Sequence, residues 1–307
     1  MNMPFDLITR VTDPEHHDAA RVRQQLDHRQ LPETLNDHEA GASRYQPDDD
    51  LLLAINSALV VGAPLLLTGE PGTGKTQVAY FLSWYLGVPL FRYQVRSTST
   101  AQDLKYDFDA VAYLRSAQHP ARGRRSRRED FLTRKALWQA YSHPGSSVLL
   151  IDEIDKAPRD FPNDLLLELD QHRFRHPFQD REVVSNGQPP VVVITSNAER
   201  RLPDAFLRRC VLHCIEMDED LVQRAVDARV GEFPRLDPDT RKKAIQRFWE
   251  LYRVEGLSKR PSTAELLTWL AVLSARKQTE DLDLDVSLVE LPSLGVLIKD
   301  AADLKKL

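Results

Sequence analysis

Cysteine is nearly absent from this chain, which has only Cys210 and Cys214 among its 307 residues. Two cysteines exclude the disulfide framework that stabilises small secreted domains. Long apolar runs are missing as well, because the run Ala58–Leu67 is interrupted by Gly62 and Pro64 and is about half as long as a membrane span. The first twenty residues lack the apolar core of a secretory signal. We therefore expect a soluble cytoplasmic protein.

A large excess of one charge is also missing. The chain has 41 lysines and arginines against 46 acidic residues, a formal net charge of -5. It is therefore not a polycation built to coat nucleic acid. Its 42% hydrophobic and 28% charged residues are typical of a globular protein. At about 150 residues per domain, the length suggests roughly two domains or one large one.

The organisation of the chain changes at two points. Residues 1–44 hold four of the nine histidines and show no sustained apolar period. They predict an N-terminal arm that is disordered in isolation or a short helix covering a neighbour. Residues 45–218 alternate β-type and helical segments, and residues 219–307 have the apolar spacing of a smaller helical domain.

Five short apolar runs predict the strands of the middle segment. Continuous apolar runs suit strands that are buried on both faces. Their alternation with helical stretches, among them 131–141, predicts an α/β fold with a parallel five-stranded sheet. The tryptophans Trp84, Trp138, Trp249 and Trp269 fall at helical positions and are expected in the core. The expected strands are Pro64–Thr68, Leu90–Val95, Ser147–Asp152, Val191–Thr195 and Cys210–Ile215.

Glycine is scarce, yet three of the 12 glycines lie in the eight residues 69–76, GEPGTGKT. This segment fits the pattern G-x-x-x-x-G-K-[ST] between an apolar strand and a helix, which predicts a phosphate-binding loop. Glycines let backbone N–H groups curl around phosphate oxygens, and the helix N-terminus adds positive potential. Lys75 would reach the β- and γ-phosphates of ATP, and Thr76 would bind Mg²⁺. The expected nucleotide contacts in this segment are Gly69, Glu70, Pro71, Gly72, Thr73, Gly74, Lys75, Thr76 and Gln77.

Carboxylates follow the buried strand 148–151. Asp152 is expected to bind nucleotide and hold the Mg²⁺ shell, because ligands bind at the carboxyl ends of parallel strands. Glu153 is placed to polarise an attacking water, which indicates hydrolysis rather than binding alone. For Asp155 two roles stay open, a part in this site or the cap of the helix that follows.

Polar residues also lie after the fourth predicted strand and before the fifth. Asn197 follows the strand 191–195, where an amide can orient water beside a γ-phosphate. Arg208 and Arg209 precede the fifth strand, and either arginine could reach the γ-phosphate in a neighbouring subunit. The alternatives are a turn residue at Asn197 and a surface salt bridge for the arginine pair.

Taken in order, these motifs resemble an AAA+ ATPase, and most closely its MoxR-like branch. The similarity covers about 45–307 and leaves out residues 1–44. It implies a nucleotide-binding domain, a helical lid and a ring, usually a hexamer, with nucleotide between subunits. The motifs that carry it are Pro64–Thr76, Val193–Asn197, Leu202–Arg209 and Arg260–Leu267.

The resemblance also assigns roles to single residues. Asn197 matches the sensor-1 position, and Arg209 best matches the arginine finger, with Arg208 as the alternative. Arg260 resembles the sensor-2 arginine, which contacts the γ-phosphate from the lid. The family implies a chaperone-like ATPase that remodels or activates a partner, commonly one with a von Willebrand factor A domain.

Three further segments are notable, and two of them have two interpretations. The arginine-rich stretch 122–128 is a solvated loop or a contact with nucleic acid or an acidic partner. Residues 174–184 look like the β-hairpin insertion of MoxR-like proteins. Tyr106 and Phe108 either line the ring pore or pack on the helix beneath them. The alternative functions are a nucleic-acid-handling motor and an ATP-gated scaffold in a defence or stress complex.

Overall fold

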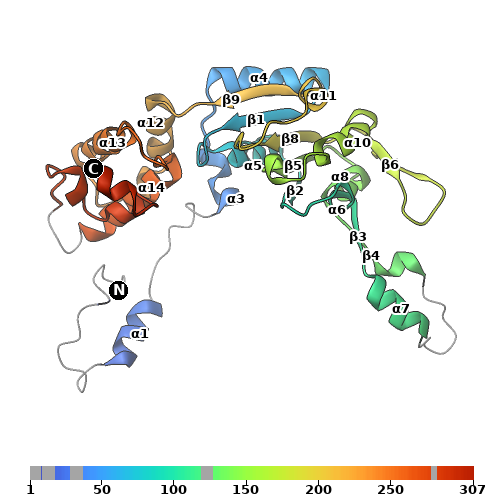
Figure 1. Cartoon of the computed structure of the whole chain (residues 1–307), viewed down its shortest axis with the longest axis horizontal. Coiled ribbons are helices and arrows are strands. Elements are labelled where there is room, and N and C mark those ends of the chain that lie inside the picture. The colour runs from blue at the N-terminus through green and yellow to red at the C-terminus, as the bar shows by residue number, and fades with distance from the viewer. Residues whose placement is uncertain (1–7, 9–17, 28–36, 119–126, 278–281) are drawn as a thin grey trace. The chain divides into compact units, whose positions relative to one another are not determined.

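The computed structural model describes residues 8, 18–27, 37–118, 127–277 and 282–307. These residues form two compact units (Figure 1). The sheet unit comprises 47–71 and 75–216, and the helical unit comprises 217–307 together with 72–74 and the described residues up to 46. Most of the predicted N-terminal arm, at 1–7, 9–17 and 28–36, lies outside the described residues. The same is true of residues 119–126, which include most of the arginine-rich stretch 122–128. No helix in the described ranges is long and apolar enough to cross a membrane.

The sheet unit is built on five parallel strands in the order β2-β5-β8-β1-β9. This confirms the predicted α/β fold. The strands are β1 (Leu65–Gly69), β2 (Leu90–Gln94), β5 (Val148–Asp152), β8 (Val191–Thr195) and β9 (Val211–Ile215). Two antiparallel hairpins add β3 (Tyr106–Phe108) with β4 (Leu132–Arg134), and β6 (Arg173–Arg175) with β7 (Glu182–Val184).

Helices surround this sheet, and all five residues of the interior strand β5 are buried. Leu149 and Ile151 face a core that includes Leu137 and Trp138 of α8. The helices of the sheet unit are α4 (Asp49–Val61), α5 (Lys75–Leu86), α6 (Ala101–Lys105), α7 (Ala110–Gln118), α8 (Ala136–Ser142), α9 (Phe161–Asp164), α10 (Leu166–Gln171) and α11 (Asp204–Leu207).

Local chemistry sets the ends of these helices. Helix α4 begins after Asp48, whose carboxylate accepts a hydrogen bond from the Leu51 N–H at 2.7 Å, and it ends at Gly62 in the left-handed conformation. The helix expected over 131–141 begins only at Ala136, because 132–134 pair with 106–108 as strand β4. Trp84 is not a core residue, since it is 53% exposed on α5.

The helical unit packs around Trp269, which is fully buried and donates from its indole nitrogen to the Pro292 carbonyl at 2.7 Å. Ser262 caps α14 through a reciprocal hydrogen-bonded pair with Glu265. The apolar core of the helical unit contains residues of the helices α12, α13 and α14. The helices of this unit are α1 (Ala19–Asp27), α3 (His38–Gly41), α12 (Glu219–Asp227), α13 (Pro238–Tyr252) and α14 (Thr263–Arg276).

Candidate nucleotide-binding site

The glycine-rich loop joins the carboxyl end of β1 to the start of α5. Gly69 has a φ of +140°, and a Cβ there would lie 2.3 Å from the backbone oxygen of Ile215 on the neighbouring strand. Gly72 and Gly74 also have positive φ values, of 80° and 90°. There is therefore no room for a side chain at Gly69, and the positive φ values disfavour residues other than glycine at Gly72 and Gly74.

Lys75 is buried and folds back onto this loop. Its Nζ donates to the carbonyl oxygens of Gly69 at 2.9 Å and Glu70 at 2.7 Å. Burial lowers the pKa of Lys75, and the negative charge of Asp155 is the largest influence that opposes this shift. The ammonium group thus sits among backbone oxygens, within the loop that is expected to bind phosphates. Thr73 and Gln77 are also buried polar residues of this segment.

Asp152 is the centre of a buried polar cluster. Its Oδ1 accepts hydrogen bonds from the hydroxyl of Thr76 at 2.9 Å and from the hydroxyl of Thr195 at 2.8 Å. Its Oδ2 accepts from a guanidinium nitrogen of Arg92 at 2.8 Å. Mg²⁺ prefers oxygen ligands, and this hydroxyl and carboxylate lie close enough together to bind the same ion. Thr76 and Asp152 therefore fit the expected metal ion, whereas Arg92 was not anticipated from the sequence.

Glu153 directly follows in a left-handed conformation, with a φ of 60°. Its N–H donates to the Thr195 hydroxyl at 2.8 Å, which anchors this strained residue to strand β8. Its carboxylate is paired with the Lys156 ammonium at 2.6 Å and with the amide of Gln94. The hydrogen bond to Glu153 raises the pKa of Lys156. The carboxylate is thus held by two side chains on its own unit.

Asp155 joins this cluster to the loop that carries Asn197. Its carboxylate is buried and accepts hydrogen bonds from the N–H of Asn197 at 3.3 Å and of Glu199 at 3.0 Å. Between them, Ala198 is left-handed with a φ of 59°. Asp155 therefore fixes the end of β8 rather than capping a helix. The sequence left its role open because the two segments are 42 residues apart.

The arginines predicted to act on nucleotide lie in other surroundings. Arg209 is ion-paired with Asp170 at 2.6 Å and donates to the Ala205 carbonyl at 2.8 Å. Arg208 is exposed, and within the described ranges its side chain has no ion-pair partner. Arg260 belongs to the helical unit, where its guanidinium lies 5.2 Å from the ring centre of Tyr252. Among the described residues, no hydrogen bond or ion pair joins Arg208 or Arg209 to Asp152.

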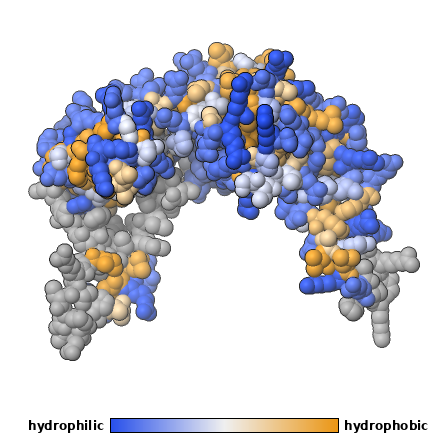
Figure 2. Space-filling model, in the orientation of Figure 1, coloured by the Kyte–Doolittle hydropathy of each residue, from blue (hydrophilic) through white to orange (hydrophobic). Residues whose placement is uncertain are grey.

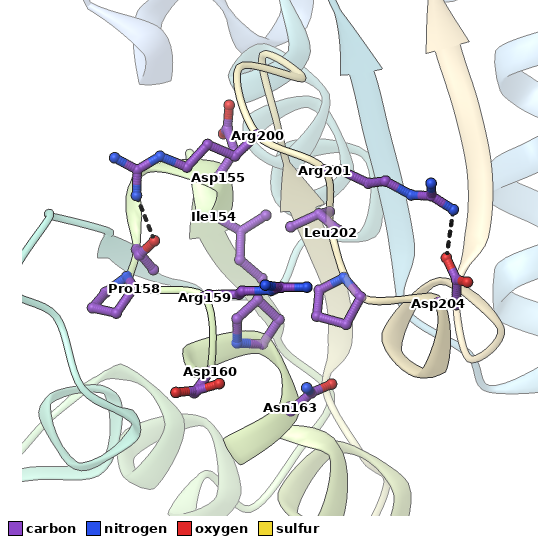
Figure 3. A pocket seen from close by; sticks show the side chains of 13 residues that line it. Ile154, Asp155, Pro158, Arg159, Asp160, Asn163, Arg200, Arg201, Leu202 and Asp204 are labelled. Carbon is purple, nitrogen blue, oxygen red and sulfur yellow. Dashed lines mark hydrogen bonds and ion pairs between the residues drawn. The ribbon is translucent and has the colours of Figure 1, made fainter.

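A cavity of about 580 Å³ opens beside Asp155 (Figure 3). Its walls come from the segments that follow β5 and β8, and they carry charges of both signs. Arg200 donates to the Ala157 carbonyl at 3.3 Å, and Arg201 pairs with Asp204 at 3.0 Å. The cavity thus borders the loop of Asn197. The lining residues are Ile154, Asp155, Ala157, Pro158, Arg159, Asp160, Pro162, Asn163, Arg200, Arg201, Leu202, Pro203 and Asp204.

The aromatic residues considered for a ring pore are half-buried and pack against other aromatic rings of the sheet unit. Tyr106 meets Trp138 edge to face at a centroid distance of 6.2 Å. Phe108 lies 4.7 Å from Phe178 and 5.9 Å from Tyr113. This arrangement favours packing over the gripping of a threaded chain. The hairpin expected within 174–184 is present as β6 and β7.

Comparison with known proteins now identifies the sheet unit. Residues 64–210 match the family model described as an AAA domain of the dynein-related subfamily. This segment has the fold of an AAA domain. The match spans β1, the Asp152 cluster and the pair Arg208 and Arg209, and it supports assignment as an AAA+ ATPase. The MoxR-like branch is not distinguished by this match.

Two further comparisons add little to the AAA domain assignment. A crystal structure of a proposed ATPase from Cytophaga hutchinsonii is similar to this chain, with 14% identity and a TM-score of 0.41. The similarity covers 79% of this chain and 78% of that one. A search of curated proteins found no match. The family match and the geometry of the site therefore carry the assignment.

Proposed function

We propose that this AAA+ protein is a Mg²⁺-dependent ATP hydrolase of the MoxR-like type. The observation that carries the proposal is the single carboxylate oxygen of Asp152 that binds both Thr76 and Thr195. This contact brings the glycine-rich loop, β5 and β8 together at one edge of the sheet. Such an edge is where ligands bind in open parallel sheets.

The proposed roles follow from the contacts. Lys75 would exchange the carbonyl oxygens of the loop for phosphate oxygens, which gain more from its charge. Thr76 and Asp152 would hold Mg²⁺, and the ion would neutralise charge on the phosphates. Glu153 would accept a proton from the attacking water once its pairs with Gln94 and Lys156 open.

The wider assembly is part of the same proposal. Residues 45–218 would form the nucleotide-binding domain and residues 219–307 its lid. Asn197 would position the water, Arg260 would contact the γ-phosphate from the lid, and Arg209 or Arg208 would act in a neighbouring subunit of a hexameric ring. The ring would remodel or activate a partner protein, and the MoxR-like type implies a partner with a von Willebrand factor A domain.

Separate substitutions test binding and hydrolysis. Lys75→Ala is expected to lose nucleotide binding, because the Lys75 ammonium is the group of this loop that would bind the phosphate oxygens. Glu153→Gln is expected to bind ATP normally but to hydrolyse it at least about 100-fold more slowly. Glu199→Gln is a matched control, since only the backbone of that residue contacts Asp155. A Glu153→Gln protein with the wild-type rate would remove Glu153 from the role of general base.

The assembly is tested by the ATPase rate per subunit across protein concentrations, with mass photometry of the same samples. A rate that rises as rings form would support an active site shared between subunits. An appreciable rate that stays constant in monomers would contradict the ring proposal. Omission of Mg²⁺ in the presence of a chelator is expected to abolish turnover.

A further inference from the structure

Strands β3 and β4 together with helix α7 form a short projection of the sheet unit, which is called the α7 arm and is distinct from the N-terminal arm. Strands β3 and β4 pair through the register Tyr106 with Arg134 and Phe108 with Leu132, and α7 follows β3 directly. The N–H of Asp109 donates to the Phe131 carbonyl at 3.0 Å and so links the residue before α7 to the residue before β4. Helix α7 is therefore fixed to the strand pair.

The loop of the second hairpin fastens this arm. Phe178 lies edge to face on Phe108, and the guanidinium of Arg128 lies 5.8 Å from the ring centres of both Phe178 and Tyr113. The amide of Gln179 donates to the Glu129 carboxylate at 3.0 Å. Aromatic and cation–π contacts of this kind hold the arm in one position on the AAA domain.

Helix α7 has apolar side chains that take no part in this aromatic packing. Tyr113 packs toward Phe108 and Phe131, while Val111 and Leu114 are 59% and 57% exposed. Residues three apart lie on one face of a helix, so the two side chains form a single stripe. Figure 2 shows apolar residues gathered over α7.

The stripe lies in the most basic part of the sequence. Residues 110–135 contain eight lysines and arginines against two acidic residues, whereas the whole chain is acidic. Of these cations, Arg115, Arg127, Arg128 and Arg134 are exposed in the described structure, and the last two lie over aromatic rings of the same unit. An apolar stripe on a helix that also exposes an arginine is complementary to a helix with leucine-type residues on one face and carboxylates on the others.

We propose that α7 with Arg115 and Arg127 is a docking surface for an acidic amphipathic segment of a partner protein. Val111 and Leu114 would receive its apolar face, and the arginines would pair with its carboxylates. The surface fits protein better than nucleic acid, because the aromatic rings that could stack on bases are engaged with one another and with Arg128. The proposal adds a recognition site to the proposed ATPase but does not require hydrolysis.

The test uses the full chain and a labelled peptide of about 20 residues with leucines at helical spacing and glutamates elsewhere. Fluorescence anisotropy compares it with a scrambled peptide of the same composition and with a DNA duplex of similar charge. The patterned peptide is expected to bind at least about tenfold more tightly than the scrambled one, because only the pattern matches the stripe.

Two double variants separate the two parts of the surface. V111S/L114S and R115E/R127E are each expected to weaken binding at least about fivefold. Leu53→Ser on α4 and Lys242→Glu on α13 are matched controls at exposed positions and should bind normally. All four proteins should keep the basal ATPase rate, so a loss of docking is distinguishable from a failure of the proposed catalytic site.

Several results would overturn the docking proposal. Absence of peptide binding would do so, as would equal binding of the scrambled peptide or unchanged binding by V111S/L114S. Tighter binding of the DNA duplex, reduced by R115E/R127E and unaffected by V111S/L114S, would assign the arm to nucleic acid instead. Circular dichroism of each variant checks that the fold is intact.

Discussion

The link between Asp155 and the loop of Asn197 gives the sharpest prediction. Asp155→Ala removes a buried carboxylate and leaves the N–H groups of Asn197 and Glu199 without their acceptor. The left-handed Ala198 between them then loses the contacts that hold it in that conformation. We expect the loop to relax and Asn197 to leave its place at the end of β8.

The size of the effect follows from the two hydrogen bonds. Bonds to a charged acceptor contribute about 1.5–3 kcal/mol each, and the 3.3 Å bond to Asn197 belongs at the weak end. Release of a buried carboxylate from its desolvation penalty offsets part of the loss. The net loss of unfolding free energy is therefore about 2–3 kcal/mol. For a unit of this size that lowers Tm by about 4–12 °C.

Thermal unfolding and two functional assays check this prediction. Hydrolysis is expected to fall about 10-fold to 100-fold because Asn197 is displaced, whereas nucleotide binding persists since Lys75 and Thr76 keep their own contacts. Asp155→Asn retains one acceptor oxygen and should lose about half as much stability. Asp160→Ala, an exposed neighbour, is the matched control and should change stability by less than about 0.5 kcal/mol. An Asp155→Ala protein with wild-type Tm and turnover would refute the reasoning.

Three further predictions concern pH, thiol chemistry and the arginine pair. The imidazole of His176 accepts two backbone hydrogen bonds in the β6–β7 loop, and burial lowers its pKa. Neutral His176 therefore stabilises the fold fully above about pH 6.5, and this stabilisation is lost as the pH falls through the folded-state pKa. His176→Asn should flatten this part of the profile of Tm against pH. Burial raises the pKa of Cys210 to about 12, so mass spectrometry after brief alkylation at pH 8 should find the label on exposed Cys214; equal labelling would contradict the burial. Arg209→Ala should lower the free energy of unfolding by up to about 1 kcal/mol because its ion pair is lost, whereas Arg208→Ala should leave it almost unchanged. The arginine finger is the residue whose alanine variant inhibits the ATPase activity of mixed rings with wild-type subunits.

The motifs of the AAA domain could be read from the sequence because each depends on a few neighbouring residues. The loop 69–76 needs its glycines for backbone path and its lysine for charge, and these requirements appear as a local pattern. The strand of Asp152 is visible because a parallel strand buried on both faces is continuously apolar. The sheet confirms that reading.

Long-range partners were not visible in the same way. Arg92 and Gln94 lie on β2 and contact the side chains of Asp152 and Glu153, which are some 60 residues away. Nothing in the local sequence of β2 distinguishes them from solvated polar residues. The faint signal was their alternation, which places both on one face of a strand.

By itself, the sequence determined the order of the strands along the chain, the phosphate-binding loop and the acidic residues after β5, because local spacing sets backbone geometry and residue chemistry. The tertiary structure alone decided that β8 lies between β5 and β1, that Asp155 holds the loop of Asn197, and that Phe178 fastens the arm of α7. Each of these depends on contacts between segments distant in sequence, whose pairing is fixed by the packing of the whole unit rather than by any local pattern.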